Sequence, residues 1–185
     1  ANCGVFSTGN PLDLTKMSLL DREKMLNRFV ACIGANSFLD IDGLYFLYGD
    51  NINLSKVKCT GLMCATYLGF NDLARTLLHY DANINVRNEH GFTCLHFAAL
   101  IGNTRMIGIL LGLGANVNGV DNYGSTPLHY AAGYYAGGVS TVRLLLERGA
   151  NINARRHTLD NMNALEMASS AKRTDVVALL QSWGR

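Results

Sequence analysis

The 185-residue sequence lacks several features that would assign a protein class at once. No basic run is longer than Arg155-Arg156, and the formal net charge is only +2, so nucleic acid and anionic membrane surfaces are poor candidates for partners. No apolar run approaches the ~18–20 residues needed to cross a bilayer. With 49% hydrophobic and 16% charged residues, the chain is too apolar for disorder and too poor in charge for a coiled coil.

Paired cysteines and catalytic motifs are also missing. The five cysteines are odd in number and form no CxxC. Cys64 and Cys94 stand among small helical residues, where a thiol behaves as a small hydrophobe, so we expect free thiols in a reducing compartment, the cytoplasm or the nucleus, and no metal site. No GxSxG elbow is present, and Gly112–Asn116 lacks the Lys-Ser/Thr of a phosphate loop. The sequence therefore predicts neither catalysis nor a bound cofactor.

The N-terminal region has a divergent helical pattern. Apolar residues recur at three- and four-residue steps over residues 18–33, with Ser18 as an N-cap and Gly34 as a stop signal. A second helix is predicted over residues 37–48, so the region is expected to form a helical hairpin. Because the sequence begins at Ala1 without a methionine, we expect it to be a piece of a longer protein.

What the sequence does contain is a period of 33 residues. Thr60, Thr93 and Thr126 are 33 residues apart, and their neighbours keep the same phase. A fourth copy places Asn163 in the role of Thr126, 37 residues later, and the extra residues fall in two loops, where a packed array tolerates insertions. The in-phase companions are Leu62, Leu95 and Leu128; Ala65, Ala98 and Ala131; and Asn85, Asn118 and Asn153.

These copies carry a family resemblance. The segment TPLHYAA (126–132), between DNYGS (121–125) and VRLLLERGANINA (142–154), closely resembles the ankyrin repeat. TCLHFAALIGN (93–103) with LLGLGANVN (110–118) is similar, TGLMCATYLGFNDLARTLLHYDANIN (60–85) is a looser copy, and ALEMASSAKRTDVVALLQSWG (164–184) resembles a terminal repeat. The resemblance implies an all-α solenoid of stacked helix-turn-helix units with short β-hairpin-like turns.

The resemblance also implies roles for particular residues. Glycines at 69, 102 and 137 are expected to end the first helix of each copy, and His96 and His129 to join neighbouring turns through backbone hydrogen bonds. Residues 172–175 are expected to form the polar outer turn of a capping repeat. The expected boundaries are a lead-in plus divergent helical hairpin over 1–54, repeats over 55–87, 88–120 and 121–153 (the last with a short inter-helix insertion), and a capping repeat over 154–185.

For function, the resemblance implies a non-catalytic, monomeric module that binds a partner protein or peptide on its concave face. In this family the turn tips and the exposed ends of the first helices contact the partner. The alternative for the aromatic side chains is packing onto the next repeat, and the alternative function is a regulatory or targeting domain of a larger enzyme, channel or ubiquitin-ligase adaptor. The candidate contact residues are Tyr67, Leu68, Glu89, His90, Phe92, Leu100, Ile101, Asn122, Tyr123, Ser125, Tyr134 and Tyr135. The corresponding positions also include Cys59 in the first clear copy and Leu159, Asp160, Met162, Ser170 and Ala171 in the last.

Two further features leave alternatives open. Arg155 and Arg156 form either a solvated face or a contact with an acidic rim on a partner. The loop asparagines Asn85, Asn118 and Asn153 resemble substrates of an asparaginyl hydroxylase, although the acidic residue often found two places before the target is an asparagine here.

Overall fold

The computed structural model describes residues 18, 20–21, 24, 38–41 and 57–183 of the chain. They belong to two compact units, residues 1–83 and residues 84–185, which are considered separately. The helix predicted over residues 18–33 lies largely outside the described residues. At its start, Ser18 Oγ accepts the backbone N–H of Asp21 at 3.2 Å, as an N-cap does.

In the first unit a short two-stranded sheet precedes a helix pair. Strand β1 (Phe38–Ile41) pairs antiparallel with β2 (Val57–Thr60), and helices α2 (Gly61–Tyr67) and α3 (Asn71–His79) follow. The prediction of a helix over residues 37–48 is therefore wrong for residues 38–41, which form strand β1. Backbone hydrogen bonds to a strand about twenty residues away decide the conformation there, and a short apolar run does not by itself distinguish helix from strand.

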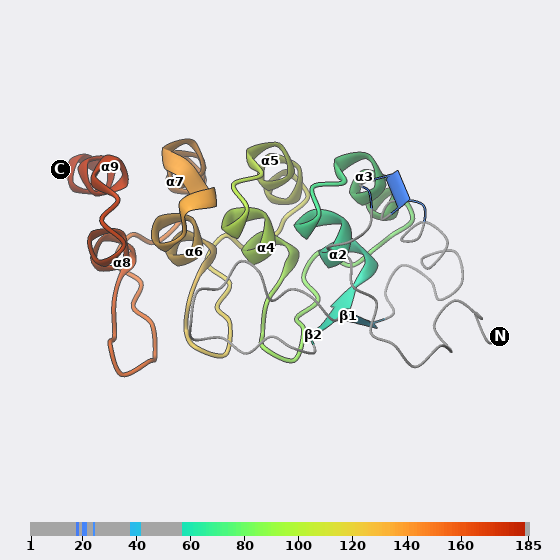
Figure 1. Cartoon of the computed structure of the whole chain (residues 1–185), viewed down its shortest axis with the longest axis horizontal. Helices are drawn as coiled ribbons and strands as arrows, with labels where there is room; N and C mark the ends of the chain where they lie inside the picture. The colour runs from blue at the N-terminus through green and yellow to red at the C-terminus, as the bar shows by residue number, and fades with distance from the viewer. Residues whose placement is uncertain (1–17, 19, 22–23, 25–37, 42–56, 184–185) are drawn as a thin grey trace. The chain divides into compact units, whose positions relative to one another are not determined.

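The second unit consists of three helix pairs. The pairs are α4 (Cys94–Leu100) with α5 (Thr104–Gly112), α6 (Pro127–Gly133) with α7 (Gly138–Glu147), and α8 (Ala164–Ser170) with α9 (Thr174–Trp183). Helices α4, α6 and α8 contact one another in that order, and α5, α7 and α9 form a second layer beside them (Figure 1). This arrangement is the all-α solenoid that the repeats predict.

The first helix of each pair begins at the residue that the period predicts. Thr93, Thr126 and Asn163 are the N-caps of α4, α6 and α8, and each has an extended backbone. Asn163 Oδ1 accepts the N–H of Glu166 at 2.9 Å. Pro127 opens α6, where its missing N–H leaves no hydrogen bond unmade.

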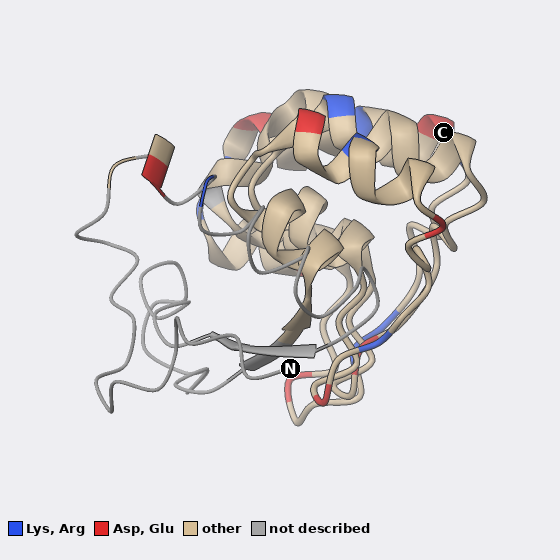
Figure 2. Cartoon of the chain, turned by 90° about the vertical axis from the view of Figure 1, so that its right-hand side faces the viewer, with Lys and Arg blue, Asp and Glu red and all other residues tan. Residues whose placement is uncertain are grey.

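The core lies between the two helix layers and between successive pairs. Ile107 and Leu110 of α5 and Val142 and Leu145 of α7 are 0% exposed, so each pair covers the apolar face of its neighbour. The described cysteines, Cys59, Cys64 and Cys94, are buried free thiols, as predicted. Lys, Arg, Asp and Glu residues occur both on the helices and on the turns (Figure 2).

The glycines of the third repeat act differently from the prediction. Helix α6 ends at Gly133, not at Gly137, and residues 134–137 form an inserted bend that contains the 3-10 helix η3 (Tyr135–Gly137). Gly137 has a φ of −64°, so it is not needed for a left-handed helix end. A Cβ on Gly137 would lie 2.3 Å from the carbonyl oxygen of Ala131. Close packing of the bend on α6 is therefore what requires glycine there.

Candidate functional site

The first two turns of the second unit are each shaped by the side chain of their first residue. Asn88 Oδ1 accepts the N–H groups of His90 (3.1 Å) and Phe92 (2.8 Å). In the next repeat Asp121 Oδ1 accepts the N–H groups of Tyr123 and Ser125, both at 2.8 Å. These bonds satisfy backbone donors inside the turn and fix its shape before any partner arrives.

Successive turns are also joined to one another. Asn122 donates its backbone N–H to the carbonyl oxygen of His90 (3.0 Å) and its side-chain Nδ2 to that of Glu89 (2.8 Å). His157 donates its N–H to the carbonyl oxygen of Tyr123 at 2.7 Å. The turns therefore form a continuous row, defined here as the turn row, which comprises residues 88–92, 121–125 and 156–162.

Two histidines behind the turn row have the structural role that the sequence predicts. His96 Nδ1 accepts the N–H of Thr93 at 3.1 Å, so its proton is on Nε2, which donates to the carbonyl oxygen of Ser125 at 3.2 Å. His129 Nε2 bonds the carbonyl oxygen of Met162 at 3.2 Å in the same way. Burial lowers the pKa of His96 to about 4 and also lowers the pKa of His129, so both rings act as neutral connectors between repeats.

An asparagine ladder joins the loop that follows α5 to the loop that follows α7. Asn118 Oδ1 accepts the N–H of Asn151 at 2.8 Å, and Asn118 Nδ2 donates to the carbonyl oxygen of Gly149 at 3.1 Å. Asn151 Oδ1 in turn accepts the N–H of Asn153 at 2.9 Å. These loop asparagines therefore have a packing role, and hydroxylation of Asn85, Asn118 or Asn153 stays a prediction.

Several predicted contact residues lie at the surface. Glu89, Asn122 and Tyr123 are exposed on the turn row, and His90, Ile101 and Tyr134 are half-buried. In the first unit Tyr67 and Leu68 are half-buried at the end of α2, and burial raises the pKa of Tyr67 to about 12. Tyr135 begins η3, and its side chain lies outside what the structure describes.

The prediction that Phe92, Leu100 and Ser125 are exposed contact residues is wrong. Their exposed fractions are 1%, 2% and 3%. The Phe92 ring packs against those of Phe97 and Tyr130, with centroid distances of 5.4 and 5.2 Å. In these two turns the residue before the N-cap of the next helix, Phe92 or Ser125, is therefore buried. For Phe92 the alternative of packing onto the next repeat is the correct one.

The prediction that residues 172–175 form the polar outer turn of the capping repeat does not hold for Arg173. This side chain is only 5% exposed, and its Nη1 donates to the carbonyl oxygens of Ala131 (2.7 Å) and Ala132 (3.1 Å). It thereby covers the end of α6, whose last carbonyls have no partner within the helix. No sequence signal distinguished Arg173 from exposed Lys172, because the carbonyls that it reaches lie about forty residues away.

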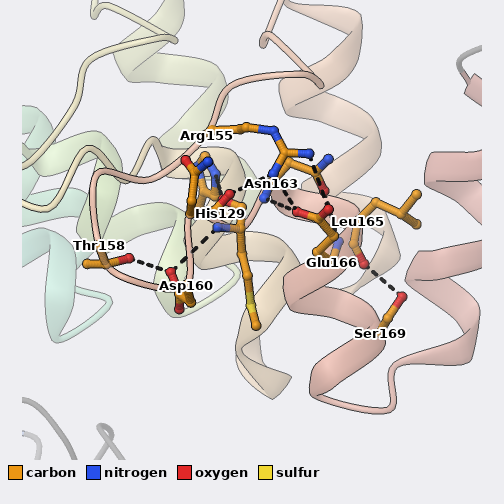
Figure 3. Close-up of polar contacts among 10 residues, drawn as sticks. His129, Arg155, Thr158, Asp160, Asn163, Leu165, Glu166 and Ser169 are labelled. Carbon is orange, nitrogen blue, oxygen red and sulfur yellow. Dashed lines mark hydrogen bonds and ion pairs between the residues drawn. The ribbon is translucent and has the colours of Figure 1, made fainter.

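Arg155 and Arg156 are engaged within the last repeat. Arg155 forms a two-pronged ion pair with Glu166, with N–O distances of 3.1 and 3.2 Å (Figure 3). Arg156 Nη1 lies 3.5 Å from the carboxylate of Asp160. A backbone hydrogen bond from Asn163, followed by Arg155, lowers the pKa of Glu166, and a hydrogen bond from Thr158 is the main cause that lowers the pKa of Asp160. Of the two alternatives for these arginines, a contact with a partner's acidic rim is therefore the less favoured, because carboxylates of the same repeat already pair with both.

Comparison with known proteins agrees with the helix pairs and turns. A family profile described as ankyrin repeats, three copies, matches residues 30–121 and 62–156, which is more than half of the chain. The chain belongs to the ankyrin repeat family. Ankyrin repeats are generally protein–protein interaction modules and are typically non-catalytic. No curated protein is significantly similar to this ankyrin repeat chain in sequence.

Within the described residues, His, Cys, Asp and Glu side chains form no group of three that would hold a metal ion. Among the helices described, none has the length and apolar character required to span a membrane.

Proposed function

We propose that the second unit binds a partner protein on its concave face, through the turn row and the adjoining ends of the first helices. The observation that supports this proposal is the turn row itself. Its backbone is held within each turn and between turns by hydrogen bonds, while Glu89, His90 and Tyr123 keep side-chain surface toward solvent. A surface that is already ordered loses little conformational entropy when it binds.

The residue types on this face suit a protein partner. Tyr123 is 36% exposed at a turn tip, and Tyr134 stacks on Tyr130 with ring centroids 5.7 Å apart. Tyrosine supplies a large, rigid contact area together with a hydroxyl group, and it is enriched among the residues that dominate binding energy. Ile101 adds an aliphatic side chain at the end of α4.

A paired binding measurement tests the proposal. The partner is isolated from source cells by affinity purification of the full chain, purified, and titrated calorimetrically against the variants. His90→Ala/Tyr123→Ala should weaken binding roughly tenfold or more and change the free energy of unfolding by only about 1 kcal/mol or less. The control, Arg105→Ala/Leu113→Ala, removes exposed side chains at the second helix layer and should bind as wild type. Equal affinity for wild type and the turn-row variant, or equal loss in both variants, would contradict the proposal.

Other predictions about the context of this module stay predictions. They are the regulatory or targeting role within a larger protein, the cytoplasmic or nuclear location and the monomeric state.

A further inference from the structure

The last turn of the turn row is longer than the others and closes on itself. It is named here the terminal hairpin, residues 155–163. Arg155 and Asn163 form an antiparallel bridge, and Arg156 donates its N–H to the carbonyl oxygen of Met162 at 3.1 Å. At the tip, Asn161 takes a φ of 44° and donates its N–H to the carbonyl oxygen of Thr158 at 2.9 Å. The hairpin therefore has a defined backbone up to its tip.

Charged side chains brace the terminal hairpin from both sides. Arg155 Nη1 donates to the carbonyl oxygen of Asn161 at 2.7 Å and also reaches Glu166, whose carboxylate accepts the N–H of Asn163 at 2.8 Å. On the other side, Asp160 accepts a hydrogen bond from the Thr158 hydroxyl (Figure 3). Asp160 also pairs with Arg156. Two cations and two carboxylates are thus matched within the hairpin and the start of α8.

The tip of the terminal hairpin carries a fully exposed leucine, Leu159. Leu159 is 110% exposed, so no neighbouring residue covers its side chain. A single exposed leucine is common on protein surfaces, but this one stands on an ordered support and next in the turn row to Tyr123, the other exposed large apolar residue among its described tips. The two turns are joined by the His157 N–H bond to Tyr123, and Gly124 lacks a side chain where the His157 ring lies, since a Cβ would be 2.6 Å from it.

We propose that the terminal hairpin inserts Leu159 into an uncharged, apolar pocket on a folded partner protein, with Tyr123 at the pocket rim. This inference rests on the proposed function and specifies the partner's chemistry. A protruding side chain fits a concave site, and burying an apolar anchor on a preorganised support contributes strongly to binding. An acidic peptide or a nucleic acid would need free cations, whereas Arg155 and Arg156 are both engaged with carboxylates.

Because the charges are paired within the terminal hairpin, the salt dependence of the affinity distinguishes an apolar contact from binding through charged residues. Because the interface needs no ion pair with the partner, affinity should change less than about threefold between about 0.1 M and about 1 M NaCl, a range over which exposed charge pairs are strongly screened. Binding through an acidic rim would weaken steeply over the same range.

Site-specific crosslinking in the full chain tests the inference. The photoreactive residue p-benzoylphenylalanine replaces Leu159 in one variant, Tyr123 in a second and Leu113, which is 56% exposed outside the turn row, in a third. In source cells, positions 159 and 123 should crosslink the same protein, and position 113 should not. With that protein purified, Leu159→Asp should weaken binding at least about tenfold, Leu113→Asp should leave it unchanged, and both variants should melt like wild type.

The outcomes separate this inference from the proposed function. A partner that crosslinks at position 123 but not 159, or that binds Leu159→Asp as tightly as wild type, overturns the anchor and leaves the turn-row proposal standing. Crosslinks at 159 only to lipid or to a second copy of the chain, or strong salt dependence, also overturn the anchor. Absence of any protein crosslink at both 123 and 159 contradicts both proposals.

Discussion

Arg173 Nη1 lies 2.5 Å from the carbonyl oxygen of Tyr134, although the two residues are 39 positions apart in the sequence. The same nitrogen contacts the last carbonyls of α6, where a positive charge also interacts favourably with the helix dipole. From the preceding repeat, Gly102 approaches the same inserted bend so closely that a Cβ would lie 2.0 Å from the carbonyl oxygen of Ala136. The bend that carries Tyr134 is therefore held from both neighbouring repeats.

Replacing Arg173 by Met should destabilise the fold. The change keeps most of the side-chain volume but leaves buried carbonyl oxygens without a donor, so the free energy of unfolding should fall by roughly 2–4 kcal/mol. Arg173→Lys keeps the charge and one donor group and should restore part of this loss. Urea denaturation measures both, with Lys172→Gln, an exposed neighbour, as the control. Equal stability of the Met variant and wild type would show that the carbonyl contacts contribute nothing.

Acid should destabilise the protein through His96. Its pKa is about 4 in the fold against an ordinary value of 6.5, so between these two pH values the unfolded chain binds a proton that the folded chain does not. The free energy of unfolding should therefore decrease as pH falls from 6.5 to 4, by ~3 kcal/mol in total, with His129 acting in the same direction. Urea titrations across this range, repeated with His96→Gln, provide the measurement. The variant should be less stable at neutral pH and should show a flatter pH dependence. An unchanged slope would assign the effect to other groups.

The inserted bend should make Gly102 less replaceable than another glycine of the same conformation. Gly102 and Gly114 both have left-handed backbones, with φ values of 73° and 87°. A Cβ on Gly114 would meet nothing within 4 Å, whereas on Gly102 it would meet the bend. Gly114→Ala should cost about 1 kcal/mol, and Gly102→Ala about 1–3 kcal/mol more. Chemical denaturation compares them, and equal losses would mean that the bend moves away at no cost.

Phe92 and Tyr123 should give opposite results, although both are aromatic residues of the turn row. Phe92 is 1% exposed and packed among aromatic rings, so Phe92→Ala should lower the free energy of unfolding by roughly 3–5 kcal/mol. Tyr123→Ala, at a tip residue that is 36% exposed, should change stability by about 1 kcal/mol or less and act on partner binding instead. A large stability loss for Tyr123→Ala would remove it from the contact surface.

The sequence predicted which residues begin the helices and fill the core of each repeat, but it missed the burial of the residue before the N-cap and the features that occur only once. Leu110 has counterparts in phase in the other repeats, so its place in the core follows from the period, and the bond from His96 to the next turn is what the family resemblance implies. The side of the turn that faces the core is set by packing between repeats, which is why Phe92 and Ser125 were assigned to the surface. Strand β1 and Arg173 depend on partners remote in sequence, and no local pattern of propensity or hydrophobicity contains that information.

The bonds between successive repeats of the second unit also bear on how it folds. His96 reaches its partner across 29 residues, Asn118 reaches Gly149 across 31, and His129 reaches Met162 across 33. Forming any of them closes a loop of about one repeat, so the entropy of loop closure stays nearly constant along the array. Folding can therefore begin at any pair of adjacent repeats and spread in either direction.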